Sequence, residues 1–381
     1  MGYGAGELSH RLSRTLSRTL AHVCRDCKRT PVSLPLGKPA VIFERVAHGS
    51  GIHHFPTAMA RFHSTLVLLF TIGVAMSSVS CSGAKFLSVQ RDPGKDGNGA
   101  SQQDGPYRVP NEVMRRLYNA PFGKVSDPAL YTSKTYGLTF KYRVYVPTQY
   151  RKEQPAAVMV FNDASSVYLG LMNTPLVLDN LIHTNEIPVT IALFLDPGTP
   201  TGEYMPTRDQ ELRSAQYDAT DGQYAQFLTE EIIKDVVRKR YQIVTDPSGW
   251  AIVGQGSGGA AAFTAAWQRP DFFRKVLTQN GSFVNIRGAG AYPELVRTDP
   301  VKPLRVYLLS GTNDLNNPFG SWLAANTAMA AAFAERDYDY RFRVGTGEHF
   351  PPVQAQADFA DALRWLWRGY SIDGKASVFK P

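Results

Sequence analysis

The sequence predicts an α/β protein with a mostly parallel central sheet and helices on both faces. Three observations lead to this class. Continuously apolar segments recur along the chain, helix-like segments separate them, and a small-residue turn directly follows one apolar segment. Strands that are apolar on both faces are typical of parallel sheets buried between helices. The turn at 254–259 then follows the carboxyl end of a strand, where such sheets place their ligand sites.

The predicted strands and helices alternate along the chain. Strands are expected at 143–146, 156–161, 189–195, 250–253, 275–278, 304–309 and 340–344. Helices are expected at 176–182, 223–240, 259–267, 322–336 and 358–368. The longest of them, at 223–240, has apolar residues at helical spacing, namely Tyr224, Phe227, Leu228, Ile232 and Val236. The sequence shows no internal repeat, and we predict one folded domain over 125–372.

Charge and histidine are concentrated near the start of the 381-residue chain. Residues 1–63 hold nine Lys/Arg and three acidic residues, so they carry +6 of the net charge of +8. The remainder shows no basic cluster of the kind that binds nucleic acid, and no nucleic-acid partner is expected. Six of the eight histidines also lie in 1–63. Only His183 and His349 remain as candidates for a catalytic base in the predicted domain.

Residues 59–81 have the features of an export signal. Arg61 and His63 precede an apolar run at 66–76, which is too short to span a bilayer, and small residues lead to Cys81. The residues before Cys81 resemble a bacterial lipobox, so lipidation of Cys81 and plain secretion are alternatives. We expect an exported protein that is periplasmic, secreted or anchored to a membrane through Cys81.

The segments around this signal carry no recognisable fold. Because the signal begins at its own methionine, residues 1–58 are expected to be a non-native extension from a wrong start, or else a disordered basic leader. Residues 82–124 are expected to form a linker, since much of the segment is rich in Gly, Asp, Gln and Pro without apolar periodicity. Residues 373–381 are expected to be a tail.

The turn at 254–259 resembles a nucleophile elbow, which has the pattern G-x-S-x-G between a strand and a helix. In that register the residues are Gly254, Gln255, Gly256, Ser257 and Gly258. Glycine therefore occupies the position of the nucleophile, and the serine comes one residue late.

Ten segments in a fixed order resemble the enterochelin-esterase-like (esterase D-like) family of α/β-hydrolases, over roughly 125–372. These are VYVPTQY (144–150), VMVFNDASSVY (158–168), FLDPG (194–198), LRSAQYDA (212–219), YAQFLTEEIIKDVVRKRY (224–241), AIVGQGSGGAAAF (251–263), NGSFVNIRG (280–288), LLSGTNDL (308–315), GEHF (347–350) and LRWLW (363–367). The resemblance implies the α/β-hydrolase fold and ester hydrolysis by a Ser-His-acid triad.

The resemblance assigns two members of such a triad. The acid falls on Asp314 and the histidine on His349, in the chain order nucleophile, acid, histidine. His183 lies inside a predicted helix and is expected to be a packing or surface residue. The implied partner is a small-molecule ester or lactone. No cofactor and no metal site are expected, and the oligomeric state is not readable from the sequence.

The resemblance also implies an oxyanion hole and a substrate-binding segment. The oxyanion donors would be the backbone N–H of Ser257 and one from the loop that contains Asp163 and Ala164, where the family usually has glycine in place of Ala164. Arg213 and Asp218 match a substrate-binding stretch of the family. That stretch normally also carries a glutamate, which is Gln216 here.

The departure at Gly256 leaves three interpretations, because an acyl transfer by serine needs a hydroxyl whose proton can pass to histidine. The first is an esterase homologue with little or no activity, a pseudoenzyme retained for binding an ester-like ligand. The second is an active hydrolase that uses Ser257 or a water activated by His349. The third is a surface lipoprotein with an adhesive or structural role.

Overall fold

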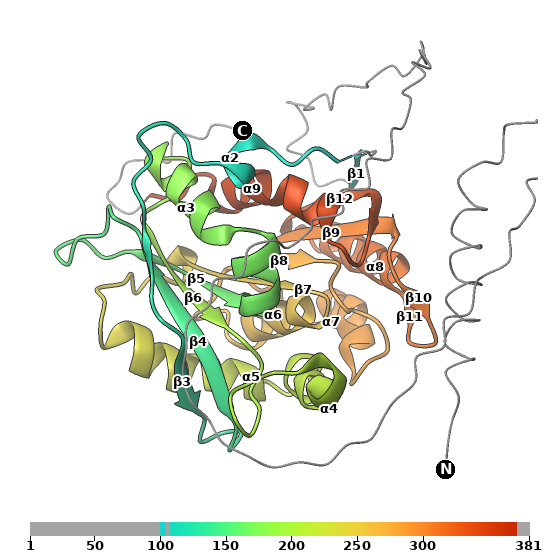
Figure 1. Ribbon diagram of the computed structural model, residues 1–381. Coiled ribbons are helices and arrows are strands. Elements are labelled where there is room, and N and C mark those ends of the chain that lie inside the picture. Colours follow the sequence, from blue (N-terminus) through green and yellow to red (C-terminus); the bar gives the residue numbers. More distant parts are fainter. Residues whose placement is uncertain (1–99, 104–106, 372–381) are drawn as a thin grey trace, which may run out of the picture. The chain divides into compact units, whose positions relative to one another are not determined.

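A computed structural model describes residues 100–103 and 107–371 (Figure 1). The predicted extension at 1–58, the export signal at 59–81 with Cys81, and the tail at 373–381 lie outside the described residues.

A ten-stranded sheet forms the centre of the domain, in the order β1-β12-β9-β8-β7-β5-β6-β4-β2, with β3 paired to β4. The first seven strands of that order run parallel, and β4 runs antiparallel to β6, β2 and β3. This confirms the predicted mostly parallel sheet. The strands are β1 (Ala100–Gln103), β2 (Lys124–Val125), β3 (Ala129–Thr132), β4 (Thr139–Val146), β5 (Ala157–Asn162), β6 (Thr190–Leu195), β7 (Trp250–Gln255), β8 (Lys275–Gln279), β9 (Arg305–Asn313) and β12 (Asp339–Glu348).

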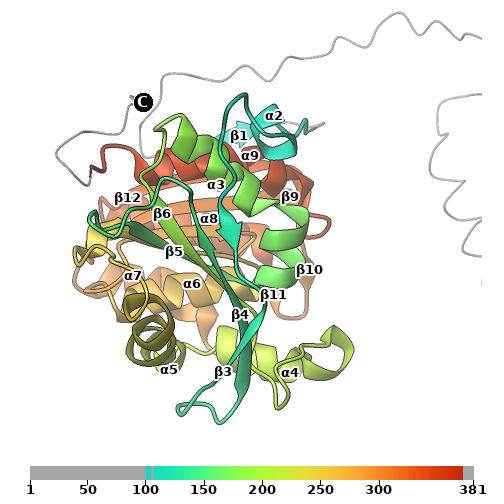
Figure 2. The ribbon, with the colours of Figure 1, turned by 60° about the vertical axis from the view of Figure 1, so that its left-hand side comes forward.

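Helices cover both faces of this sheet (Figures 1 and 2). One face packs against α2 (Asn111–Met114), α3 (Thr174–His183) and α9 (Val353–Trp367). The other packs against α5 (Gln223–Gln226), α6 (Ser257–Gln268), α7 (Tyr292–Thr298) and α8 (Trp322–Glu335). Successive residues of β5 point to opposite faces, so Val158 and Val160 join one core while Met159 and Phe161 join the other.

The predicted elements are confirmed, with differences in extent and type. The helix predicted at 223–240 consists of α5 and η2 (Phe227–Arg238), and η2 has π-helical hydrogen bonding. Elements that the sequence did not predict are β1, α2, β2, β3, η1 (Ala164–Leu171), α4 (Pro206–Tyr217), η3 (Pro247–Gly249), η4 (Ala289–Ala291), α7 and the hairpin of β10 (Asn316–Asn317) and β11 (Gly320–Ser321). Most of them are short or largely polar, so they lack the apolar periodicity used for the prediction.

Part of the segment expected as a linker packs on the domain. Strand β1 pairs with β12, and Val113 of α2 is buried. Arg116 forms a 2.8 Å ion pair with Asp179 of α3, which is almost fully buried. The domain therefore includes residues that precede Val125, because β1 extends the edge of the sheet while α2 and Arg116 pack on its α3–α9 face.

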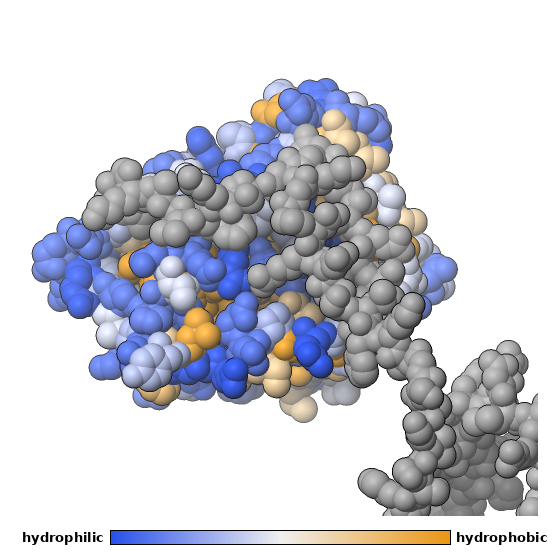
Figure 3. All heavy atoms as spheres, turned by 90° about the horizontal axis from the view of Figure 1, so that it is seen from above, coloured by the Kyte–Doolittle hydropathy of each residue, from blue (hydrophilic) through white to orange (hydrophobic). Residues whose placement is uncertain are grey.

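The surface seen in Figure 3 is mostly hydrophilic, with hydrophobic residues scattered over it. Among residues 100–103 and 107–371, no helix has both the length and the apolar character needed to cross a bilayer.

Candidate active site

A sharp turn at Gly256 joins strand β7 to helix α6. Gly256 has φ +55° and ψ −126°, a conformation that L side chains rarely adopt and that costs glycine little. Its N–H donates to the Gln279 carbonyl at 2.9 Å, and its carbonyl accepts from the Ser282 N–H at 3.0 Å. The end of β8 thus holds both sides of the turn, as an elbow between a central strand and a helix requires.

The close approach of β7 and α6 explains why positions 254 and 258 are glycine. A Cβ atom at Gly254 would lie 2.0 Å from the Gly258 carbonyl oxygen, and one at Gly258 would lie 2.6 Å from Oδ2 of Asp163. Neither position has room for a side chain, because the obstacle at Gly254 is backbone and Asp163 is held by an ion pair.

We expect Gly254→Ala to destabilise the domain by at least about 3 kcal/mol, since the strand and the helix must separate to admit a methyl group. The measurement is the free energy of unfolding in urea. Gly170→Ala is the matched control, because a Cβ atom there meets only the Ser165 carbonyl at an ordinary 3.4 Å. Equal losses for the two variants would contradict this account of the turn.

The structure brings His349 and Asp314 together beside Gly256. Nδ1 of His349 lies 2.8 Å from Oδ1 of Asp314. On the opposite side of the ring, Nε2 lies 3.0 Å from where a Cβ atom at position 256 would stand. A proton on Nδ1 that is donated to the carboxylate leaves Nε2 as a proton acceptor directed at the turn. His183, the other candidate, is the last residue of α3 and is not part of this cluster.

Asp314 is held by residues that the sequence analysis did not name. Its carboxylate, 0% exposed, accepts from the Asn280 side-chain amide at 2.7 Å, the Ser310 hydroxyl at 3.2 Å and the Leu315 N–H at 2.7 Å. These donors fix the orientation of Asp314 and hence of His349. Their sequence signal was modest: Asn280 and Ser310 are polar residues near the carboxyl ends of apolar strands.

Ser257, the alternative nucleophile, lies near Asp218. It is the first residue of α6, and its hydroxyl lies near the carboxylate of Asp218. Burial raises the pKa of Asp218, and hydrogen bonds from Ser214 and Ser257 lower it in part. The Ser257 hydroxyl therefore lies near Asp218, while a Cβ atom at Gly256 would lie 3.0 Å from Nε2 of His349.

The loop expected to supply an oxyanion donor lies beside the start of α6. Asp163 has φ +54°, and Ala164 follows it as the first residue of η1. Arg213 holds the Asp163 carboxylate through two bonds, from Nε to Oδ1 at 2.8 Å and from a terminal nitrogen to Oδ2 at 2.6 Å. The Arg213 guanidinium also lies over the ring of Tyr217, 5.2 Å from its centroid.

Arg213 and Gln216, in the expected substrate-binding stretch, form hydrogen bonds that hold two neighbouring loops in place. Arg213, as described, fixes the Asp163 loop. Gln216 bonds to both the N–H and the carbonyl of Gly198, at 2.7 and 2.8 Å. A neutral amide suits this position because it must donate to one backbone group and accept from the other.

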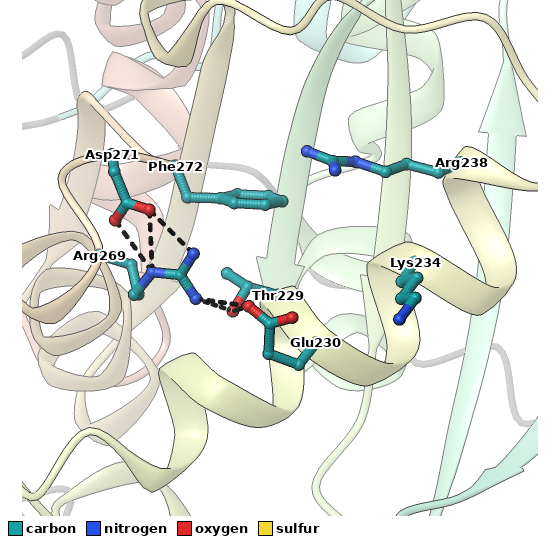
Figure 4. A pocket seen from close by; sticks show the side chains of 7 residues that line it. All are labelled: Thr229, Glu230, Lys234, Arg238, Arg269, Asp271 and Phe272. Atoms are coloured by element: carbon teal, nitrogen blue, oxygen red, sulfur yellow. Dashed lines mark hydrogen bonds and ion pairs between the residues drawn. The ribbon is translucent and has the colours of Figure 1, made fainter.

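A surface hollow of about 450 Å³ lies elsewhere, on η2 and the loop after α6 (Figure 4). Its Arg269 is paired with both Glu230 and Asp271. The hollow shares no residue with the His349 cluster, so it does not change the assignment of the candidate active site to Gly256, Asp314 and His349. Within the described part of the chain, no group of three or more His, Cys, Asp or Glu residues could hold a metal ion.

Three features define the protein as an α/β-hydrolase. They are the order of the strands in the sheet, the glycine turn between β7 and α6, and the acid and histidine that follow β9 and β12. Residues 133–366 match the model of the family described as "Putative esterase". The chain belongs to this family.

Solved structures share the fold at low sequence identity. The enterobactin esterase of Shigella flexneri is 18% identical, with a TM-score of 0.52, over 66% of this chain and 61% of that one. The ferric enterobactin esterase of Salmonella typhimurium is 17% identical, with a TM-score of 0.54, over 68% and 61%. A ferulic acid esterase of Anaeromyces mucronatus is 16% identical, with a TM-score of 0.52, over 69% and 98%.

The match to the two enterobactin esterases spans only 61% of each of those chains. With the family match, these structures confirm the resemblance to enterochelin-esterase-like hydrolases. Among curated proteins, none matches the chain.

Proposed function

We propose that this domain is an esterase-family protein without the covalent step of serine esterases. It binds a small carboxylic ester or lactone and hydrolyses it weakly or not at all. The observation that carries this proposal is the position of Gly256, where a Cβ atom would lie 3.0 Å from Nε2 of His349. A serine esterase needs a hydroxyl at this place, and glycine supplies none.

The remaining parts suit the binding of an ester carbonyl. The N–H of Ser257 opens the twelve-residue helix α6, whose amino-terminal end favours negative charge. The Asp163–Ala164 loop lies beside it. Leu315 and Phe350 directly follow Asp314 and His349, and they expose 41% and 65% of their surface. These apolar side chains support a ligand whose ester group carries an apolar acyl or aryl part.

A second candidate is hydrolysis by a water that His349 activates. The His349–Asp314 pair favours it, because Nε2 faces the turn and the imidazole is 23% exposed, so water can reach it. The placement of Ser257 beside Asp218 gives no support to Ser257 as the nucleophile. Export and lipidation at Cys81 stay predictions.

Hydrolysis of p-nitrophenyl acetate by the purified full chain tests the proposal. We expect no burst of p-nitrophenol and no acyl adduct in the intact mass, because position 256 carries no hydroxyl. Any slow turnover should survive Ser257→Ala and be lost in His349→Ala. A burst with an acyl adduct that Ser257→Ala abolishes would overturn the proposal and restore Ser257 as the nucleophile.

A further inference from the structure

Ser282 also lies close to the position that a nucleophile at 256 would occupy. It follows β8, and its N–H bond to the Gly256 carbonyl keeps it against the turn. Its Oγ atom lies 3.8 Å from where a Cβ atom at 256 would stand, and Nε2 of His349 lies 3.0 Å from the same point. Ser282 is only 2% exposed, so its hydroxyl is part of the interior of the site.

Trp322 fixes the direction of the Ser282 hydroxyl. The indole N–H of Trp322 donates to Oγ of Ser282 at 3.1 Å. Because an indole N–H can only donate, the Ser282 oxygen accepts in this bond and its proton remains to be given to another partner. Trp322 is itself buried, and its ring meets the imidazole of His349 edge-on at a centroid distance of 5.9 Å.

We propose that Ser282, His349 and the bare backbone of Gly256 form a binding site for one hydrolytic water, with Ser282 as its positioning residue. This inference rests on the proposed function. Nε2 and Oγ lie 3.0 and 3.8 Å from the Cβ point, so a water placed beyond that point, clear of the Gly256 Cα, has both atoms as its two polar partners. A glycine at 256 is required, since a side chain there would occupy the same place.

The reaction that such a water would perform is direct hydrolysis. The water oxygen accepts from the Ser282 hydroxyl and attacks the ester carbonyl carbon while Nε2 of His349 takes its proton. The resulting oxyanion collapses, the bond from the carbonyl carbon to the alcohol oxygen breaks, and His349 returns the proton to the leaving alcohol. One ester and one water give one acid and one alcohol, and no bond to the protein forms.

The test compares Ser282→Ala in two backgrounds of the full chain. In the native background we expect kcat for p-nitrophenyl acetate to fall about tenfold with KM unchanged, because one hydrogen bond to the water is lost. In the Gly256→Ser background the effect should shrink to about twofold or less, because a hydroxyl at 256 replaces the water. Trp322→Phe should lower kcat in the same direction, since the Ser282 hydroxyl can then turn away.

Ser133→Ala is the matched control, because Ser133 is 1% exposed and its hydroxyl has partners outside the site, namely the Tyr136 N–H at 3.1 Å and the Glu231 carboxylate. The water site is overturned if Ser282→Ala leaves the native kcat unchanged, if Ser133→Ala lowers it equally, or if the native chain shows no His349-dependent hydrolysis. None of these results affects the proposal of ester binding without a covalent step. An acyl adduct on the native chain would instead overturn that proposal.

Discussion

Gly256→Ser is expected to create acyl-enzyme chemistry in this domain. A hydroxyl carried by a Cβ atom 3.0 Å from Nε2 of His349 is within reach of that nitrogen, and Asp314 already orients the ring. We expect hydrolysis of p-nitrophenyl acetate to rise on the order of 100-fold or more, with an acyl adduct at position 256 in the intact mass. His349→Ala in the same background should abolish both.

The same substitution is expected to lower stability. Serine at φ +55° and ψ −126° is strained, which costs about 1–3 kcal/mol, and the close approach to His349 adds to it. Gly256→Ala is the control, because it has the same backbone strain without the hydroxyl. A folded Gly256→Ser variant with no gain over Gly256→Ala would show that the oxyanion donors or the histidine are misplaced.

Arg213→Met is expected to destabilise the domain by about 3–5 kcal/mol, because it leaves the Asp163 carboxylate buried without its partner. The side chains of Arg213 and Asp163 are only 20% and 8% exposed. The loop that carries Ala164 depends on this pair, so binding of the ester should weaken as well. Unfolding in urea gives the stability, and titration with a non-hydrolysable ester analogue gives the affinity.

Arg297→Met is the matched control for the ion pair. Arg297 bonds to Glu335 at 2.6 Å, but the two side chains are 32% and 52% exposed, so we expect a loss of less than about 1 kcal/mol. Adding Asp163→Asn to Arg213→Met should recover part of the stability, since it removes the unpaired charge. Equal losses for the single arginine variants would contradict the assignment of Arg213 as a buried partner of Asp163.

Most of the fold could be predicted because its central strands are unambiguous. Every residue of β5, β6, β7 and β8 is buried, and such short apolar runs between helices point to a parallel sheet. Helix α4 escaped prediction for the opposite reason. Only three of its twelve residues are buried, two of them polar, so its sequence has no apolar stripe.

In the candidate site, the sequence could predict only the residues that stand in family motifs with a known role. Gly256, Asp314 and His349 stand at recognisable positions in sequence. Asn280 and Ser282 lie in a recognisable segment, but the sequence assigned them no role, because they meet Asp314 and Gly256 only through the pairing of β8 with its neighbours in the sheet. The directions of the Ser257 and Arg213 side chains likewise depend on tertiary contacts that no local pattern encodes.

Strand β1 pairs with β12 along one edge of the central sheet, beside the strand that leads to His349. The two strands are parallel, and Ala100 pairs with Phe342, six residues before the end of β12 at Glu348. His349 follows at the far end of that strand. Without residues 100–103, β12 would be the edge strand on this side of the sheet, and its backbone N–H and C=O groups at 342–345 would lose their partners in β1.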